Sequence, residues 1–283
     1  MLLNRKKRRG MSPIISTLLI MVTTMFALSF TVSFVQSSLS RRENENDYEF
    51  AKVFMNAVGL QMDEVAWRPS QRESIQYTSQ YAELYVREVI LRYEIIVKYV
   101  GSTNETIITT IDCNGLFFSI PVSRYSLGND YFANIQPDSM ISLVQMNTTS
   151  PIVRVFAVQK NPIVNENDYI RIGIVPLIRG IPFSITSGVS KTNYLKLFIV
   201  RINKGTETGG QPKTIALTGV SVNAQVFSDV EYIKVNLSFP KGPEGYSNEF
   251  FRFPETSQII NYGSEGVNLE LYVGALDVGY ETR

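Results

Sequence analysis

The chain has 283 residues with 27 basic and 26 acidic side chains, no histidine and one cysteine, Cys113. This composition excludes Ser-His-Asp and Cys-His catalytic sites, His-ligated zinc sites and any disulfide within the chain. Residues 1–10 hold five of the basic residues, so the remaining 22 basic and 26 acidic side chains leave a mildly acidic chain, which argues against nucleic acid as a partner.

The N-terminus joins a basic cluster to a long apolar segment. The five positive charges of Arg5–Arg9 stop at Gly10, and no charged side chain follows from Met11 to Ser40. As a helix, Ile14–Val35 would be about 33 Å long, enough to cross a hydrocarbon core of about 30 Å. The basic flank predicts that this end stays in the cytoplasm and that the rest of the chain lies outside. The segment is too long for a cleaved secretory signal, whose apolar region has about 7–15 residues.

The residues around Gly10 form a recognisable motif. Arg8-Arg9-Gly10 is followed by Met11-Ser12-Pro13-Ile14-Ile15-Ser16-Thr17-Leu18-Leu19-Ile20. This order resembles the class III signal peptide of archaeal type IV pilin-like proteins, in their Ser-Pro branch. The resemblance implies that a prepilin-type signal peptidase cuts between Gly10 and Met11, and that the exposed helix then contacts other pilins or further copies of itself. Many pilins carry a glutamate five residues into the mature chain, where this sequence has Ile15.

Residues 11–67 are predicted to form a transmembrane and amphipathic stalk helix after a basic leader of residues 1–10. Ser12 and Pro13 suit a helix start, as capping residue and first helical residue. Seven serines and threonines between Ile14 and Val35 fit either contacts between helices or hydrogen bonds to the helix's own carbonyls. Bends are expected near Glu43 and at Gly59. Beyond the membrane segment, apolar residues recur at spacings of three and four: Phe50, Val53, Phe54, Ala57, Val58, Met62 and Val65.

The sequence of residues 70–283 predicts an extracellular β domain. Runs rich in Val, Ile, Tyr and Phe alternate with turn residues and predict about a dozen strands. The fold class is therefore α+β, a long N-terminal membrane-spanning and amphipathic helix followed by a mainly antiparallel β-sandwich head, with room for two lobes that meet near residues 180–192. A slip in alternation between Val86 and Val89 predicts a turn or bulge at Arg87-Glu88, and Asn114-Gly115 predicts a further turn.

Three Asn-x-Ser/Thr sequons, at Asn104, Asn147 and Asn236, are candidate glycosylation sites on the predicted outside. Cys113 is expected to be a small buried residue in a strand or turn, with an interchain bridge as the alternative. The acidic string Asn165–Tyr169 offers oxygen ligands for calcium, yet it lacks the glycine and terminal glutamate of an EF-hand loop, so a solvated turn is expected. No catalytic site, metal site or cofactor is predicted.

These features favour a non-enzymatic cell-surface protein of the pilin-like kind. We expect processing after Gly10, a single membrane pass with the N-terminus cytoplasmic and the C-terminal domain extracellular, and assembly into or association with a filament. The 273 residues left after cleavage suit a minor or adhesin-like subunit better than a bulk subunit. The alternative is a single-pass, membrane-anchored β-sandwich ectodomain that binds a ligand or envelope partner without polymerising. A surface hydrolase is disfavoured, since histidine and catalytic motifs are absent.

Overall fold

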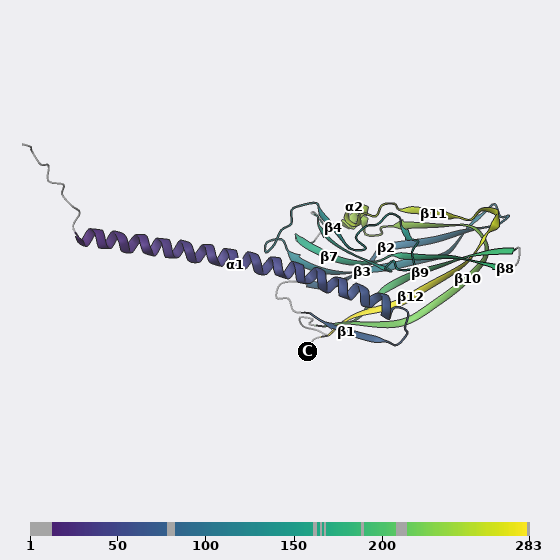
Figure 1. Cartoon of the computed structure of the whole chain (residues 1–283), viewed down its shortest axis with the longest axis horizontal. Helices are drawn as coiled ribbons and strands as arrows, with labels where there is room; N and C mark the ends of the chain where they lie inside the picture. The colour runs from purple at the N-terminus through teal and green to yellow at the C-terminus, as the bar shows by residue number, and fades with distance from the viewer. Residues whose placement is uncertain are drawn as a thin grey trace, which may run out of the picture. The chain divides into compact units, whose positions relative to one another are not determined.

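A computed structural model describes residues 13–77, 83–160, 163–164, 166, 168–187, 190–207 and 214–281. The chain forms two compact units, Met1–Asn46 and Asp47–Arg283. Over its described residues the first unit is helix alone, and the second unit holds the rest of that helix together with the strands (Figure 1).

The long helix α1 spans Pro13–Val65 as one element. The predicted bend positions near Glu43 and at Gly59 both lie inside it. Two 3₁₀ turns, η1 (Gly242–Glu244) and η2 (Gly263–Glu265), and the short helix α2 (Asn248–Phe251) occur among the later strands. The strands are β1 (Arg72–Gln76), β2 (Glu83–Tyr99), β3 (Glu105–Pro121), β4 (Tyr131–Gln136), β5 (Val144–Gln145), β6 (Val153–Gln159), β7 (Tyr169–Pro176), β8 (Ile178–Ser187), β9 (Ser190–Glu207), β10 (Thr214–Ser238), β11 (Ser257–Asn261) and β12 (Val267–Glu281).

The strands form one 12-stranded sheet in the order β4-β6-β7-β3-β2-β10-β12-β9-β8-β5, with β1 and β11 also paired to β10. The β9–β12 and β5–β8 pairs are parallel and the other described pairs are antiparallel. A long helix followed by a mainly antiparallel β domain is therefore confirmed. The predicted lobe junction at residues 180–192 falls in the β8–β9 hairpin, where Ile178–Ser187 pairs with Ser190–Ile199.

The sheet is a curled half-barrel rather than the predicted plain sandwich. Strand β10 is 25 residues long and joins both sides, since it pairs with β1 and β12 near its start and with β2 and β11 near its end. Bulges between Gly219 and Ser221 and between Phe227 and Val230 mark where its pairing with β12 shifts, and bulges of this kind bend a strand. The curl brings β3 against β9, which stand four places apart in the sheet order: Cys113 Sγ lies 4.0 Å from the carbonyl oxygen of Val200.

The predicted irregularity in β2 is confirmed as a bulge. The register between β2 and β3 shifts between Arg87 and Leu91, and Val89 has a φ of 49°. The backbone N–H of Val89 donates a 2.8 Å hydrogen bond to Asn114 Oδ1. Asn114 therefore lies inside β3, where its side chain completes the bulge of the neighbouring strand. The turn predicted at Asn114-Gly115 is wrong for this reason.

One face of the sheet is covered by the part of α1 within the second unit, from Asp47 to Val65. Phe54, Val58, Met62 and Val65 are buried, as their spacing predicts, and Tyr48, Ala51 and Met55 join them. The rest of the predicted apolar stripe is wrong, because Phe50, Val53 and Ala57 are exposed, Val53 to 71%. At about 100° per residue these three positions lie on the opposite side of the helix.

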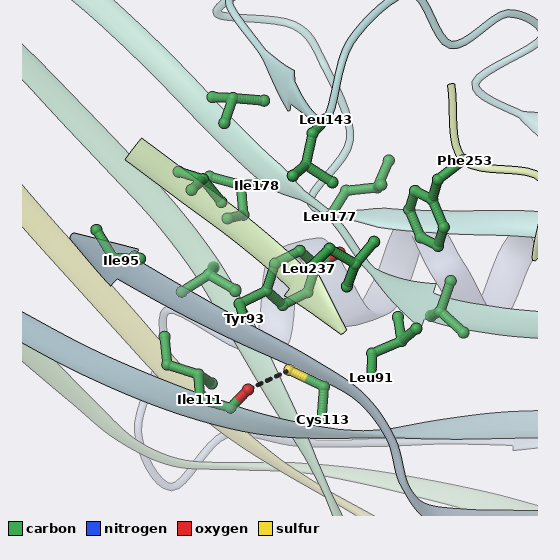
Figure 2. Close-up of a cluster of buried hydrophobic side chains, with 14 of the residues drawn as sticks. Leu91, Tyr93, Ile95, Ile111, Cys113, Leu143, Leu177, Ile178, Leu237 and Phe253 are labelled. Atoms are coloured by element: carbon green, nitrogen blue, oxygen red, sulfur yellow. Dashed lines mark hydrogen bonds between the residues drawn. The ribbon is translucent and has the colours of Figure 1, made fainter. Parts of the chain in front are cut away.

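The other face of the sheet encloses a second core. Figure 2 shows Leu91, Tyr93 and Ile95 of β2 in this core together with Ile111 and Cys113 of β3. Helix α2 closes it with two fully buried rings, Phe250 and Phe251. The hydroxyl of Tyr93 satisfies its donor by a 2.9 Å hydrogen bond to the carbonyl oxygen of Pro176. The β domain thus has two apolar cores, one on each side of a shared sheet.

Candidate membrane anchor and surface sites

The described part of the first unit is an apolar helix with the length and composition of a membrane span. No charged side chain occurs between Pro13 and Ser40, and the most apolar window of the helix is entirely exposed. Large apolar side chains cover it, Phe26 being 78% and Phe30 69% exposed. Such a surface is costly in water and favourable in lipid. The chain therefore has one N-terminal helix long and apolar enough to cross a membrane, and Ile14 and Val35 lie within it.

Several hydroxyls of this helix are satisfied by its own backbone. Thr23 Oγ1 donates to the carbonyl oxygens of Leu19 and Ile20, at 2.9 Å each. Thr24 and Thr31 bond to carbonyls four residues earlier in the same way. At these three positions the structure agrees with the intrahelical alternative, in which a hydroxyl needs no neighbouring helix. The processing residues Gly10 and Met11 lie outside the described residues.

The three sequons differ in accessibility. Asn104 is exposed in the connection between β2 and β3. Asn147 is exposed after β5, and its Oδ1 accepts hydrogen bonds from the N–H and the hydroxyl of Thr149, both at 3.2 Å. Asn236 is half-buried within β10, paired to both β2 and β11, and its Oδ1 accepts a 2.8 Å hydrogen bond from Ser257 Oγ. Asn104 and Asn147 are therefore freely accessible, whereas the side chain of Asn236 is half-buried and hydrogen-bonded to its neighbour.

Cys113 is fully buried in β3, so the prediction of a small buried strand residue is confirmed. Its Sγ lies 3.8 Å from the carbonyl oxygen of Ile111, the contact drawn in Figure 2. Burial raises the pKa of the thiol, which keeps it protonated and unreactive.

An arginine occupies the core without an ion-pair partner among the described residues. Arg154, fully buried in β6, donates to Asn134 Oδ1 from Nε at 3.0 Å and from Nη2 at 2.6 Å. Burial lowers the pKa of its guanidinium from 12.5 to about 10, so the group stays charged at neutral pH. The sequence signal is an arginine within the apolar run of β6, because a cation at such a position must find buried acceptors. Aromatic rings surround it, those of Phe132, Phe156 and Phe253.

A second buried cluster gathers around Glu166. Its carboxylate forms ion pairs with Arg87 and with the nearly fully buried Arg171, the latter at 2.8 Å. The hydroxyl of Tyr246 donates to the same carboxylate at 3.1 Å, and burial is the main reason why the pKa of Tyr246 rises to about 12. Two arginines and a tyrosine hydroxyl thus contact the carboxylate of Glu166, which belongs to the string Asn165–Tyr169. Asn165 and Asn167 lie outside the described residues.

A hollow of about 400 Å³ lies among residues of β1, β9, β10 and β12. Gly205 and Gly279 form part of its wall where β9 approaches β12, and Asp277 accepts a 3.0 Å hydrogen bond from Asn203 Nδ2. Its side chains do not select one class of ligand. Over the described ranges, His, Cys, Asp and Glu residues do not gather in threes as a metal site would require.

No protein family, curated protein or solved structure matches this chain. The functional argument therefore depends on the residues and their geometry.

Proposed function

We propose that the protein is a non-enzymatic, pilin-like cell-surface protein, anchored by the helix that contains Ile14–Val35 and processed between Gly10 and Met11. In this proposal a prepilin-type signal peptidase removes the leader at the cytoplasmic face, and the β domain is displayed outside. The processed chain joins or accompanies a type IV pilus-like filament as a minor or adhesin-like subunit.

The observation that supports this proposal is the abrupt boundary at Gly10. Five cationic residues precede the glycine, and the helix that follows exposes apolar side chains on all sides. The cations hold the leader at the cytoplasmic surface, because moving them through the hydrocarbon core is costly. Removing them would replace five cationic side chains by the single α-ammonium group of Met11, so the helix could more easily exchange lipid contacts for contacts with apolar helices.

A membrane-anchored ectodomain that never polymerises is the second candidate, and a specific observation favours it. The hydroxyls of Thr23, Thr24 and Thr31 are already bonded within their own helix, so they supply no evidence for a neighbouring helix. Ile15 stands where many pilins carry glutamate. In this case the β domain would act as a tethered binding module.

The test is the N-terminal sequence of the protein purified from cell envelopes. The proposal expects a chain that begins at Met11, and a Gly10→Val variant that retains the leader and begins at Met1. A Leu3→Val variant, changed within the leader but away from the junction, should be processed normally. A native chain that still begins at Met1 would overturn the pilin-like proposal and leave the anchored ectodomain. Sheared filament fractions that lack the processed protein would also favour the ectodomain.

A further inference from the structure

Strand β10 has an open backbone edge in its middle. From residue 221 to residue 227 it pairs with β12 on one side only, and residues 220 and 228 lie in the bulges at the two ends of this stretch. At one end of this stretch Gly219 exchanges hydrogen bonds with the segment before β1, from its N–H to Gln71 O at 2.9 Å and to its carbonyl from Ser70 N at 2.8 Å. At the other end the carbonyl of Asp229 accepts from Val100 N at 2.8 Å. Within the described chain, the second side of the intervening nine residues has no backbone partner.

Apart from the β-bulges at its two ends, this edge lacks the features that protect free strand edges. Its sequence is Val220-Ser221-Val222-Asn223-Ala224-Gln225-Val226-Phe227-Ser228, with no charge, proline or glycine. Val220 is 47% and Val226 68% exposed. Natural proteins block such edges with charges, proline or very short strands. The five-residue strand β1, with Arg72 and Glu73 at its start, shows that protection in the same sheet. An unprotected edge of this length fits strand addition by a partner.

We propose that the open edge of β10 pairs antiparallel with the same edge of a second copy of this chain. Residues that face each other in an antiparallel pair share a face of the sheet, so a symmetric pair must be centred on one residue. The open stretch between Gly219 and Asp229 is centred on Ala224. Ala224 therefore faces Ala224 of the second copy, and the two sheets become continuous.

The side chains suit this register. With Ala224 at the centre, Val222 of each copy faces Val226 of the other, which gives two apolar cross-strand pairs on one face. Asn223 faces Gln225 on the opposite face. No like charges meet, since the stretch has none. The stretch is thus self-complementary in size and polarity, and this is the reason why a second copy is proposed as the partner.

The valine pairs would extend an existing row of side chains. Ala224 is paired with Tyr272 of β12, and Val226 with Glu270. The ring of Tyr272 stacks on Phe198 at 4.9 Å, and Lys196 forms a 3.1 Å ion pair with Glu270. Side chains on this face are therefore in contact as far as β12, the strand next to the open edge. The pairing goes beyond the proposed function, because it needs neither cleavage at Gly10 nor a filament.

The test uses disulfide crosslinking of the full chain purified in detergent. The only native cysteine is fully buried, so an Ala224→Cys variant has one reactive thiol. Directly opposed residues have Cα atoms about 4.5–5.5 Å apart, within the range that a disulfide requires. The matched control is Val220→Cys, whose two thiols would lie about 27 Å apart along the paired strands at 3.4 Å per residue. We expect at least about tenfold more covalent dimer from Ala224→Cys than from the control.

Three results would overturn the pairing: no covalent dimer from Ala224→Cys, an equal yield from both variants, or capture of a different envelope protein at residue 224. Val220→Cys combined with Ser228→Cys should restore crosslinking, since these positions face each other in the proposed register. The leader's fate does not enter the experiment, so its outcome is separate from that of the N-terminal sequencing. A lysine at 224 gives an independent readout, because like charges directly opposite destabilise a strand pair. Ala224→Lys should lower the dimer fraction in sedimentation, whereas Ile107→Lys, at an exposed position outside β10, should not.

Discussion

Arg154 Nη1 donates a 2.6 Å hydrogen bond to the backbone carbonyl oxygen of Phe251, so a buried guanidinium ties the start of β6 to the end of α2. Asn134 of β4 accepts the other two bonds of the same group. One side chain thus joins three elements, and its charge is stabilised by oxygens and aromatic faces instead of a carboxylate.

Replacing Arg154 should therefore unpair the buried carbonyl of Phe251 and the half-buried Oδ1 of Asn134. We expect Arg154→Met to lower the free energy of unfolding by about 2–4 kcal/mol, since each unsatisfied buried group costs about 1–3 kcal/mol. Asn134→Leu should cost more, because it leaves the buried cation short of acceptors. The double variant should lose less than the sum of the two single losses, and additive losses would contradict the network. Denaturant unfolding measures all three, with Arg92→Met at the protein surface as a control that should change little.

The bulge in β2 predicts a stabilising substitution. Val89 adopts a φ of 49°, which a β-branched residue reaches only with strain and glycine reaches freely. Val89→Gly should raise the free energy of unfolding or leave it unchanged, within about 1 kcal/mol. Val86→Gly, at a half-buried position in the same strand without positive φ, should be destabilising by about 1 kcal/mol or more. Equal losses from both variants would show that the backbone at Val89 is not strained.

Stability should be lost at alkaline pH. Burial raises the pKa of Tyr77 from 10.0 to about 12. Between these values the unfolded chain releases a proton that the folded chain keeps, so this contribution is complete below pH 10 and is lost as the pH rises towards 12. Tyr77→Phe should make the fall in thermal midpoint between pH 10 and 12 less steep than in the native chain. Between pH 6 and 8 the midpoint should be nearly constant, because the chain has no histidine.

Glycan occupancy, if the organism modifies sequons, should follow accessibility. We expect modification at the exposed Asn104 and Asn147 and much less at Asn236, whose amide is half-buried and hydrogen-bonded to Ser257. Intact mass should fall by one glycan in Asn104→Gln and in Asn147→Gln, and change only by the substitution in Asn236→Gln. An Asn236 glycopeptide as abundant as those of Asn104 and Asn147 would contradict this order.

Local sequence patterns predict most of the helical and strand segments, because strand alternation and helix periodicity depend only on residues close in sequence. The bulge near Val89 was visible as a slip in alternation, and Phe54 and Val58 followed the helix period. The same period predicts Phe50 and Val53 on the buried side, which is wrong, because both sides of that helix segment carry apolar residues and only contact with the sheet decides between them.

The features that escaped prediction depend on distant residues. Arg154 finds one acceptor 97 residues away in sequence, at Phe251, and no local pattern reveals that pairing. The curl of the sheet depends on β10, whose two ends pair with different strands. Neither partner choice can be read from the sequence of β10, so the sequence does not distinguish two separate sheets from one curled sheet.

The position of β12 has a consequence for how the domain is made. This strand lies between β10 and β9, and in the sheet order it alone connects β9, β8 and β5 to the remainder. The earlier strands emerge during synthesis before the segment that joins them exists. If the chain is exported, its sheet would therefore remain incomplete during translocation. The tertiary structure would form fully only after residues 267–281 have crossed the membrane.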